Sequence, residues 1–309
     1  MVTSGTSTFN LDLNDLIEEA FERCGLELRT GYDFRTARRS LNILSIEWAN
    51  RGINLWTVEQ GQISMVTGQA IYPLPVDTID LMDHVVRQNN GTTNQIDINI
   101  TRIAEPTYIT IPNKLTQGRP IQVWVNRQSG QENTTALTLS GNIAATDTTI
   151  TLSSTVGLAT AGFIKIGTET ISYPNISGNQ LLNCARGQNN TTAASHLSGA
   201  AISVQNLPCI NVWPTPNAPG NQYTFIYYRL RRIQDAGTDG TYIQDIPFRF
   251  IPPLVAGLAY QLSMKLPNVD PNRIMALKAS YEELYQQAGE EDRDKAPLRF
   301  VPRNMNYTR

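Results

Sequence analysis

Histidine and cysteine are scarce in this chain, so the metal sites and catalytic patterns that depend on them have little support. The only histidines are His84 and His196, and the three cysteines are widely spaced with no CxxC pair. Neither histidine stands at ligand spacing from the other or from a cysteine, so we expect no zinc site and no disulfide framework. We interpret the cysteines as small buried hydrophobic residues of a chain made in a reducing cytoplasm: Cys24, Cys184 and Cys209.

Motifs of the common enzyme classes are also missing. The sequence has no GxSxG, no Walker A loop, no dinucleotide-binding GxGxxG and no HExxH. The acidic residues Glu18, Glu19 and Glu22 fall on a predicted helix surface, where solvation is the expected role. Two carboxylates brought together by the fold are the one route to hydrolysis that the sequence leaves open. We therefore predict no enzyme activity, with no catalytic residue, no cofactor and no metal ion.

An excess of one charge and a long hydrophobic run are lacking as well. Charged residues make up 17% of the chain and the formal net charge is −2, so there is no bulk electrostatic drive toward nucleic acid. The longest apolar stretch, 250–262, contains prolines and is too short to cross a bilayer. The first ten residues lack the basic start and apolar core of a signal peptide. We expect a globular protein with no membrane partner.

Two amphipathic helices are predicted near the start of the chain. Apolar residues recur at helical spacing over 13–24, and Gly25 follows as a stop signal. A second helix is predicted over 33–51, with Asp33 as its N-cap and Gly52 after its end. A short link between them favours a helical hairpin.

Two further helices and an extended tail are predicted toward the end of the chain. One helix covers 247–266, and the next begins at Asp270-Pro271, an acidic cap followed by proline at the first helical position. The acidic run 290–294 ends it. The tail 296–309 has two prolines and no helical period, so we expect it to extend as an arm. Its aromatic and basic residues are Arg299, Phe300, Arg303, Tyr307 and Arg309.

Between the helices the pattern changes to short β-strands. We predict a hairpin around the turn 66–68, and further strands over 79–87, 95–104, 121–127 and 222–233. Residues 129–204 are rich in Thr, Ser, Asn, Gly and Ala and contain short β-type runs, which indicates a small β-barrel or β-sandwich module. The flanking segments 122–127 and 208–213 fit each other as a hairpin, so the module is predicted as an insertion in its turn, where insertions cost little.

The predicted architecture is α+β. It combines a helical bundle from the N- and C-terminal helices, a central antiparallel β domain, the inserted β module and the extended C-terminal tail. The predicted domains are an adaptor core of residues 1–128 and 205–295, an insertion of residues 129–204, and an arm of residues 296–309.

Three motifs in order along the chain resemble one protein family. They are a Trp-Ala-Asn-Arg-Gly-Ile-Asn-Leu-Trp run at 48–56, a YxLPxD turn at 72–77, and Val-Trp-Val at 123–125 leading past the insertion to Val-Trp-Pro-Thr-Pro at 212–216 and Tyr-Thr-Phe-Ile-Tyr-Tyr at 223–228. Residues 11–127 and 205–290 thereby resemble the head-to-tail adaptor proteins of podophages, called tail tubular protein A or gatekeeper adaptors.

The insertion has a resemblance of its own. A strand at 147–152, a stretch with Gly167, Glu169, Ile171 and Tyr173, then Arg186-Gly187 and a Thr-rich loop ending in His196 look like a small β module of phage tail proteins. The resemblance implies that His196 is a structural loop residue.

The adaptor resemblance implies a structural virion protein. Members of that family form a dodecameric ring, a connector that binds the portal protein on one side and the tail nozzle protein on the other, and double-stranded DNA passes through its lumen during ejection. The implied location is the portal vertex of the bacteriophage tail, after assembly in the host cytoplasm.

Candidate site residues follow from this resemblance and from charge. The arm would dock on the portal, with Phe300 and Tyr307 as apolar anchors and Arg299, Arg303 and Arg309 pairing with portal carboxylates. The module 129–204 would seat tail fibres or the nozzle, or be a decoration without a partner. A basic strand segment would contact DNA phosphates in the lumen, or else subunit interfaces or solvent: Arg229, Arg231 and Arg232.

Two alternatives stay open. The Thr- and Asn-rich β module also suits a tail fibre or another carbohydrate-binding virion protein, although helices at both ends of the chain argue against a fibre. A virion-associated hydrolase would need clustered acids or a nucleophile. Ring formation with portal, a trimer, or activity on polysaccharide would separate these hypotheses.

Overall fold

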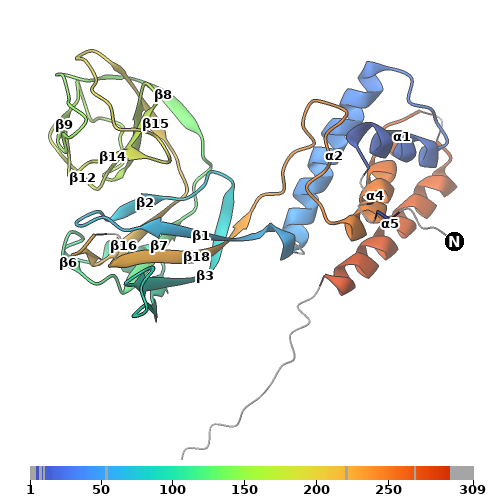
Figure 1. Ribbon diagram of the computed structural model, residues 1–309. Helices are drawn as coiled ribbons and strands as arrows, with labels where there is room; N and C mark the ends of the chain where they lie inside the picture. Colours follow the sequence, from blue (N-terminus) through green and yellow to red (C-terminus); the bar gives the residue numbers. More distant parts are fainter. Residues whose placement is uncertain are drawn as a thin grey trace, which may run out of the picture. The chain divides into compact units, whose positions relative to one another are not determined.

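The structure is a computed structural model that describes residues 5, 6, 9, 11–52, 55–219, 222–267 and 269–292. It is mixed α/β with several antiparallel sheets, as the α+β prediction requires (Figure 1). The chain divides into two compact units, residues 1–56 with 233–309 and residues 57–232. The first unit holds the long helices and the second holds the sheets. The predicted boundaries of the insertion fall inside the second unit and stay predictions.

Helix α1 (Leu13–Cys24) begins and ends where the sequence predicts. Its N-cap is Asp12, whose carboxylate accepts a hydrogen bond from the Asp15 amide at 2.9 Å. At the other end Gly25 adopts the left-handed conformation, with φ at 77°, which a residue without Cβ takes at little cost. The predicted stop signal is therefore confirmed.

Helix α2 (Gly31–Arg51) starts two residues before the predicted Asp33, and the prediction of Asp33 as N-cap was wrong. The N-cap is Thr30, and Asp33 is the third residue of a capping box. The Thr30 amide donates to the Asp33 carboxylate at 3.1 Å, and the Asp33 amide donates to the Thr30 hydroxyl at 3.2 Å. Reciprocal bonding satisfies two backbone donors, which explains why the earlier start is preferred.

The C-terminal helices are α4 (Ile251–Ser263) and α5 (Pro271–Glu291). Helix α4 is shorter than the predicted range of 247–266, because the 3-10 turn η2 (Phe248–Phe250) precedes it. The predicted cap of α5 is confirmed, since the Asp270 carboxylate accepts from the Asn272 amide at 3.0 Å.

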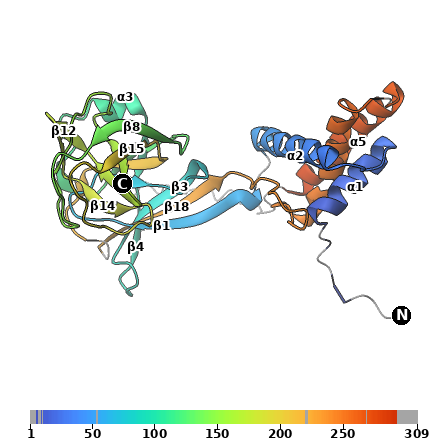
Figure 2. The ribbon, with the colours of Figure 1, turned by 90° about the horizontal axis from the view of Figure 1, so that it is seen from above.

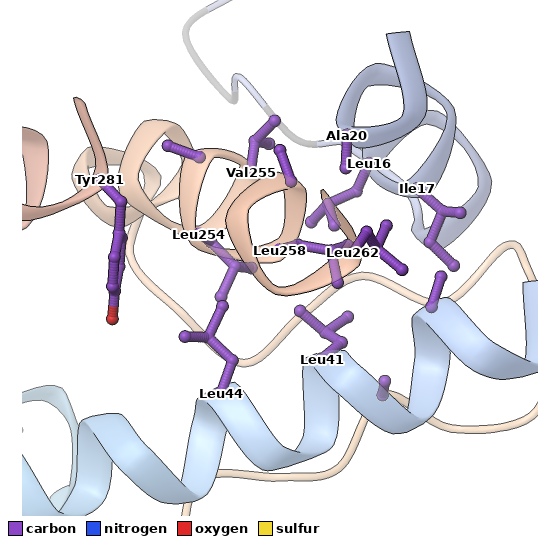
Figure 3. Close-up of a cluster of buried hydrophobic side chains, with 14 of the residues drawn as sticks. Leu16, Ile17, Ala20, Leu41, Leu44, Leu254, Val255, Leu258, Leu262 and Tyr281 are labelled. Carbon is purple, nitrogen blue, oxygen red and sulfur yellow. The ribbon is translucent and has the colours of Figure 1, made fainter. Parts of the chain in front are cut away.

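One hydrophobic core joins the four long helices that the structure describes. Figure 3 shows side chains of α4 between those of α1 and those of α2, with α5 contributing a tyrosine. The labelled residues are each at most 2% exposed: Leu16, Ile17, Ala20, Leu41, Leu44, Leu254, Val255, Leu258, Leu262 and Tyr281. Gly257 permits this close packing, because a Cβ there would lie 2.8 Å from Cε2 of Tyr281. Helices from both ends of the chain therefore form one packed unit.

The second unit contains two four-stranded sheets, ordered β1-β18-β3-β4 and β2-β16-β7-β5, and the pair β17-β6. Strands β1 and β18 lie side by side in both views (Figure 1, Figure 2). The bounds are β1 Val58–Ser64, β2 Ile71–Pro73, β3 Thr78–Gln88, β4 Ile96–Asn99, β5 Thr101–Ile103, β6 Gln117–Gly118, β7 Gln122–Asn126, β16 Cys209–Trp213, β17 Thr215–Pro216 and β18 Tyr223–Arg231.

The predicted hairpin between 122–127 and 208–213 is confirmed. Strands β7 and β16 pair antiparallel, with Val123 opposite Val212 and Val125 opposite Ile210. These four side chains belong to the core of the sheet pair. The intervening residues therefore leave and rejoin the sheet at one place, as an insertion in a hairpin turn does.

The hairpin predicted around residues 66–68 was wrong. Strand β1 pairs with β18 and strand β2 pairs with β16, so the two predicted partners belong to different sheets. The predicted strand over 95–104 likewise divides into β4 and β5, which also enter different sheets. A short helix, α3 (Glu105–Ile109), was not predicted. Pairing with distant strands that bury more apolar surface overrides local turn signals here.

The inserted segment has its own hydrophobic core and two open sheets, ordered β14-β11-β10-β15-β8 and β12-β13-β9. Both sheets have free edge strands, so the predicted option of a closed barrel is not what these residues form. The short β-type runs of the sequence at 149–152, 163–166 and 170–173 coincide with β9, β10 and β11. The bounds are β8 Glu132–Thr138, β9 Ile150–Thr151, β10 Gly162–Ile166, β11 Glu169–Tyr173, β12 Asn175–Ser177, β13 Gln180–Leu182, β14 Ala185–Gln188 and β15 Ala201–Gln205.

Candidate interaction surfaces

The predicted portal-docking residues lie outside the described part of the chain, which ends at Asp292. Those residues are Arg299, Phe300, Arg303, Tyr307 and Arg309. Their role stays a prediction.

The predicted DNA-contacting arginines have very different surroundings. Arg229 is 9% exposed, and its guanidinium bonds to Asp77 and, at 2.8 Å, to Glu59. Arg231 bonds to the other Glu59 oxygen at 2.6 Å, so both arginines lie on one face of β18. Burial raises the pKa of Asp77, but the hydrogen bond and charge of Arg229 outweigh this and lower it. These ion pairs favour a structural role, tying β18 to β1, over contact with phosphate. Arg232 is exposed.

A buried carboxylate organises the inserted segment. Glu169 is fully buried and bonds to Nε and Nη2 of Arg186, both at 2.8 Å, and to Nε2 of His196 at 2.7 Å. The amides of Gly187 and Ala194 also donate to it. Burial raises the pKa of Glu169, but these hydrogen bonds outweigh burial and lower it to about 2. The Arg-Gly and Thr-rich loop motifs are thus held together by one side chain, and His196 is a structural residue of the loop.

His84 is the other histidine and lies on β3 opposite Tyr227 of β18. Its ring lies beside that of Phe225, with the centroids 5.8 Å apart, and neither ring nitrogen has a hydrogen-bond partner among the described residues. Burial lowers the pKa of His84, and the charge of Arg102 adds to the effect. The arrangement favours a neutral ring packed in the sheet.

We expect acid to weaken the fold through His84. The pKa of His84 is lower in the folded state than in the unfolded state, so the unfolded state takes up a proton more readily. The contribution of neutral His84 to the unfolding free energy is therefore complete above about pH 6.5 and is lost as the pH falls through the pKa of the folded state. Urea unfolding should therefore give a smaller unfolding free energy at about pH 5 than at about pH 7.5. A His84→Leu variant should show a flatter dependence. An equal slope in both proteins would assign the effect to other groups.

A cavity of about 670 Å³ lies between the inserted segment and the β2-β16-β7-β5 sheet. Tyr108 and Trp124 lie together in its lining, with ring centroids 5.2 Å apart and the ring planes tilted by 31°. The lining also contains aromatic and amide side chains: Phe163, Tyr173, Asn126, Gln128, Asn206 and Asn211. Apolar rings with a few amide groups suit a small polar ligand such as a sugar. This cavity is the feature most consistent with the carbohydrate-binding alternative.

The outer face of α2 carries exposed apolar side chains in a line. Tyr32 is 64% exposed, Ile43 is 55% and Ile46 is 62%. Together with Arg35, Arg39 and Asn50 they recur at helical spacing, on the side opposite the buried Leu41 and Leu44. We call these six residues the α2 stripe. This stripe was not predicted, although Ile43 and Ile46, spaced off the buried face of the helix, were the available signal in the sequence.

An acid-rimmed groove of about 460 Å³ runs beside α1. Its apolar floor is Leu11, Ile251, Pro252 and Val255. The rim is formed by one face of α1: Asp15, Glu18, Glu19, Glu22 and Arg23. Arg23 pairs with Glu19 at 2.8 Å, which leaves the other three carboxylates without a cation within 4 Å among the described residues. The carboxylates expected to be merely solvated thus border an apolar hollow.

The three cysteines are free and buried, as predicted. Burial raises the pKa of Cys184 and Cys209 to about 12, so neither is a reactive thiolate at neutral pH. Among the described residues, no three His, Cys, Asp or Glu side chains gather where they could hold a metal ion. Within the same residues, none of the helices combines the length and apolar character needed to cross a membrane.

Neither the models of known protein families nor the curated protein sequences contain a match to this chain.

Proposed function

We propose that this chain is a structural subunit of a head-to-tail adaptor ring in a short-tailed bacteriophage. In this role it joins the portal to the tail nozzle and surrounds part of the channel through which DNA passes. The helices of the first unit would form a bundle in the ring wall, and the inserted module would be available to tail fibres or the nozzle. The corresponding location is the tail at the portal vertex.

The pairing of β7 with β16 carries this proposal. The two halves of the resemblance are separated in sequence by residues 129–204, yet Val123-Trp124-Val125 and Val212-Trp213 lie on adjacent strands in register. The motifs on either side of the insertion therefore belong to one continuous sheet, which supports a single adaptor core interrupted by a later module. The motif residue Trp48 is likewise part of the helical core.

The α2 stripe is a second line of support. A helix that packs one face on its own core and exposes a tyrosine and two isoleucines on the other presents the kind of surface that subunit contacts cover. Assembly with other copies would remove these side chains from water. Assembly into a ring would therefore explain why the α2 stripe exposes apolar side chains.

Removal of residues 296–309 should abolish binding to portal rings while leaving the fold intact. The arm combines two aromatic residues with three arginines, a composition that suits anchoring on a partner. Wild-type and shortened chains would be mixed with portal rings from the phage genome that encodes this chain, and ring-on-ring complexes counted by negative-stain microscopy. Circular dichroism of the shortened chain serves as the control for folding.

The adaptor function and the docking role of the arm are contradicted by different outcomes. A wild-type chain that ignores portal rings and forms a trimer would favour the fibre or carbohydrate-binding alternative, in which the cavity beside Trp124 becomes the relevant site. Undiminished binding by the shortened chain would refute the docking role of the arm but leave the adaptor function standing.

A further inference from the structure

We infer that neighbouring copies of this chain associate through two different faces, the α2 stripe of one copy docking into the acid-rimmed groove of the next. The inference rests on the proposed ring function and specifies the contact that would build the ring. Both surfaces belong to the helical unit, and both are formed by residues that the structure describes.

The α2 stripe supplies the basic and apolar half of the contact. Nε of Arg35 donates to the Gly31 carbonyl and Nη2 of Arg39 to the Thr36 hydroxyl, both within the same helix. Neither guanidinium lies within 4 Å of a carboxylate in the described part of the chain, whereas Arg23 and Arg51 in the same unit each pair with glutamate. The stripe thus offers two arginines for charge-assisted bonds and three apolar side chains for burial.

The groove supplies the acidic and apolar half. Asp15, Glu18 and Glu22 stand on its rim, and its floor is made of aliphatic side chains and a proline. Arginine pairs with carboxylate in a planar, often bidentate geometry, while isoleucine and tyrosine fill apolar hollows. Charge and polarity are therefore complementary between the stripe and the groove.

A symmetric contact between identical faces fits the charges poorly. The stripe contains no acidic residue, so joining two stripes would bring four arginines together without counter-charges. Joining two grooves would do the same with carboxylates. Like charges across an interface disfavour that pairing, so the stripe is better matched to the groove.

The two faces lie on different sides of the helical unit. Figure 3 shows α4 between α1 and α2, and the stripe points away from the core that α2 shares with α4. A contact between two different faces is heterologous, and repeating it gives a ring when the rotation closes. The surfaces are therefore arranged as a ring subunit requires.

Charge reversal on each face provides the test. An Arg35→Glu/Arg39→Glu variant and a Glu18→Arg/Glu22→Arg variant should each self-associate at least roughly a hundredfold more weakly than the wild type. An equimolar mixture of the two should recover assembly, because each reversed face then meets an oppositely charged partner in alternation. Sedimentation velocity, with and without portal rings, measures the association.

A matched control separates this contact from a change in net charge. Arg29→Glu/Lys278→Glu alters the charge of the same unit by the same amount on other exposed positions and should assemble like the wild type. Circular dichroism shows whether each variant is folded, and the recovery on mixing would itself exclude misfolding as the cause of lost assembly.

The results distinguish the inference from the proposed function. The inference would be overturned if either charge-reversed variant assembled alone, or if the two folded variants did not assemble when mixed. The adaptor function would still stand in either case if the wild type bound portal rings. A wild type that stays monomeric at high concentration, both alone and with portal rings, would overturn the inference. If it also fails to bind the portal rings, the proposed function fails with it.

Discussion

Replacing Glu169 with glutamine is expected to destabilise the inserted segment by about 3–5 kcal/mol, the usual effect of removing one partner of a buried ion pair. The side chain of Arg186 is only 6% exposed and bonds to both carboxylate oxygens. Glutamine keeps the shape but removes the charge and one acceptor oxygen, so a buried guanidinium is left without its counter-ion. Most of the effect comes from that uncompensated charge.

Hydrogen exchange is the suitable measurement, because the chain has two units and a single unfolding transition is not assured. Amides of β10, β11 and β15 should lose protection in the variant, while amides of the helices keep it. Asp97→Asn is the matched control, since the Arg87–Asp97 pair lies at the surface, where solvent and salt screen the attraction between the two charges. Equal protection in wild type and Glu169→Gln would show that the network does not hold the segment together.

The pH dependence of stability should provide a second, independent test of Glu169. Because the pKa of Glu169 is lowered to about 2, its stabilising effect is present above its ordinary value and lost as pH falls from about 4.5 toward 2. The glutamine variant should lack this dependence. The loss of stability begins near pH 4.5 for Glu169 and near pH 6.5 for His84, so the pH at which the loss begins separates the two groups.

Replacing Trp48 with alanine is expected to destabilise the helical unit by about 3–5 kcal/mol, the range for large aromatic truncations in a core. The ring is 1% exposed and packs against Phe250 and Tyr285 at centroid distances of 5.6 and 5.4 Å. Its Nε1 also donates to the Tyr281 hydroxyl at 2.9 Å. The substitution therefore leaves a cavity and a lost hydrogen bond where α2, α4 and α5 meet.

Ile46→Ala is the matched control, because it lies on the same helix but on its exposed face. Denaturant unfolding followed by helical circular dichroism should change by less than about 0.5 kcal/mol for Ile46→Ala. The same variant should weaken self-association, since its side chain belongs to the α2 stripe. Trp48→Ala with wild-type stability would contradict the core assignment, and Ile46→Ala with wild-type assembly would argue against the stripe as an interface.

Local signals were sufficient to locate the four long helices. Gly25 after a period of apolar residues, and Asp270-Pro271 before another, placed one end of α1 and the start of α5, because caps and periodicity act within a few residues. The N-cap of α2 was predicted at Asp33 instead of Thr30, since both are good capping residues and only their reciprocal hydrogen bonds decide between them. The β7–β16 pairing was also predictable, because alternating Val123 and Val125 demand a matching strand.

Apart from the β7–β16 pair, tertiary structure alone decided which distant strands pair and which charges meet. The partner of β1 is β18 rather than β2, and Arg229 lies beside Glu59 and Asp77 instead of facing solvent, because both outcomes depend on surface buried between segments far apart in sequence. The α2 stripe and the groove have the same origin. The sequence by itself determined that Ile43 and Ile46 lie off the buried face of α2. Packing of the opposite face of α2 against α4 then left these two isoleucines exposed, and the packing of α1 against α4 placed the α1 carboxylates beside an apolar floor.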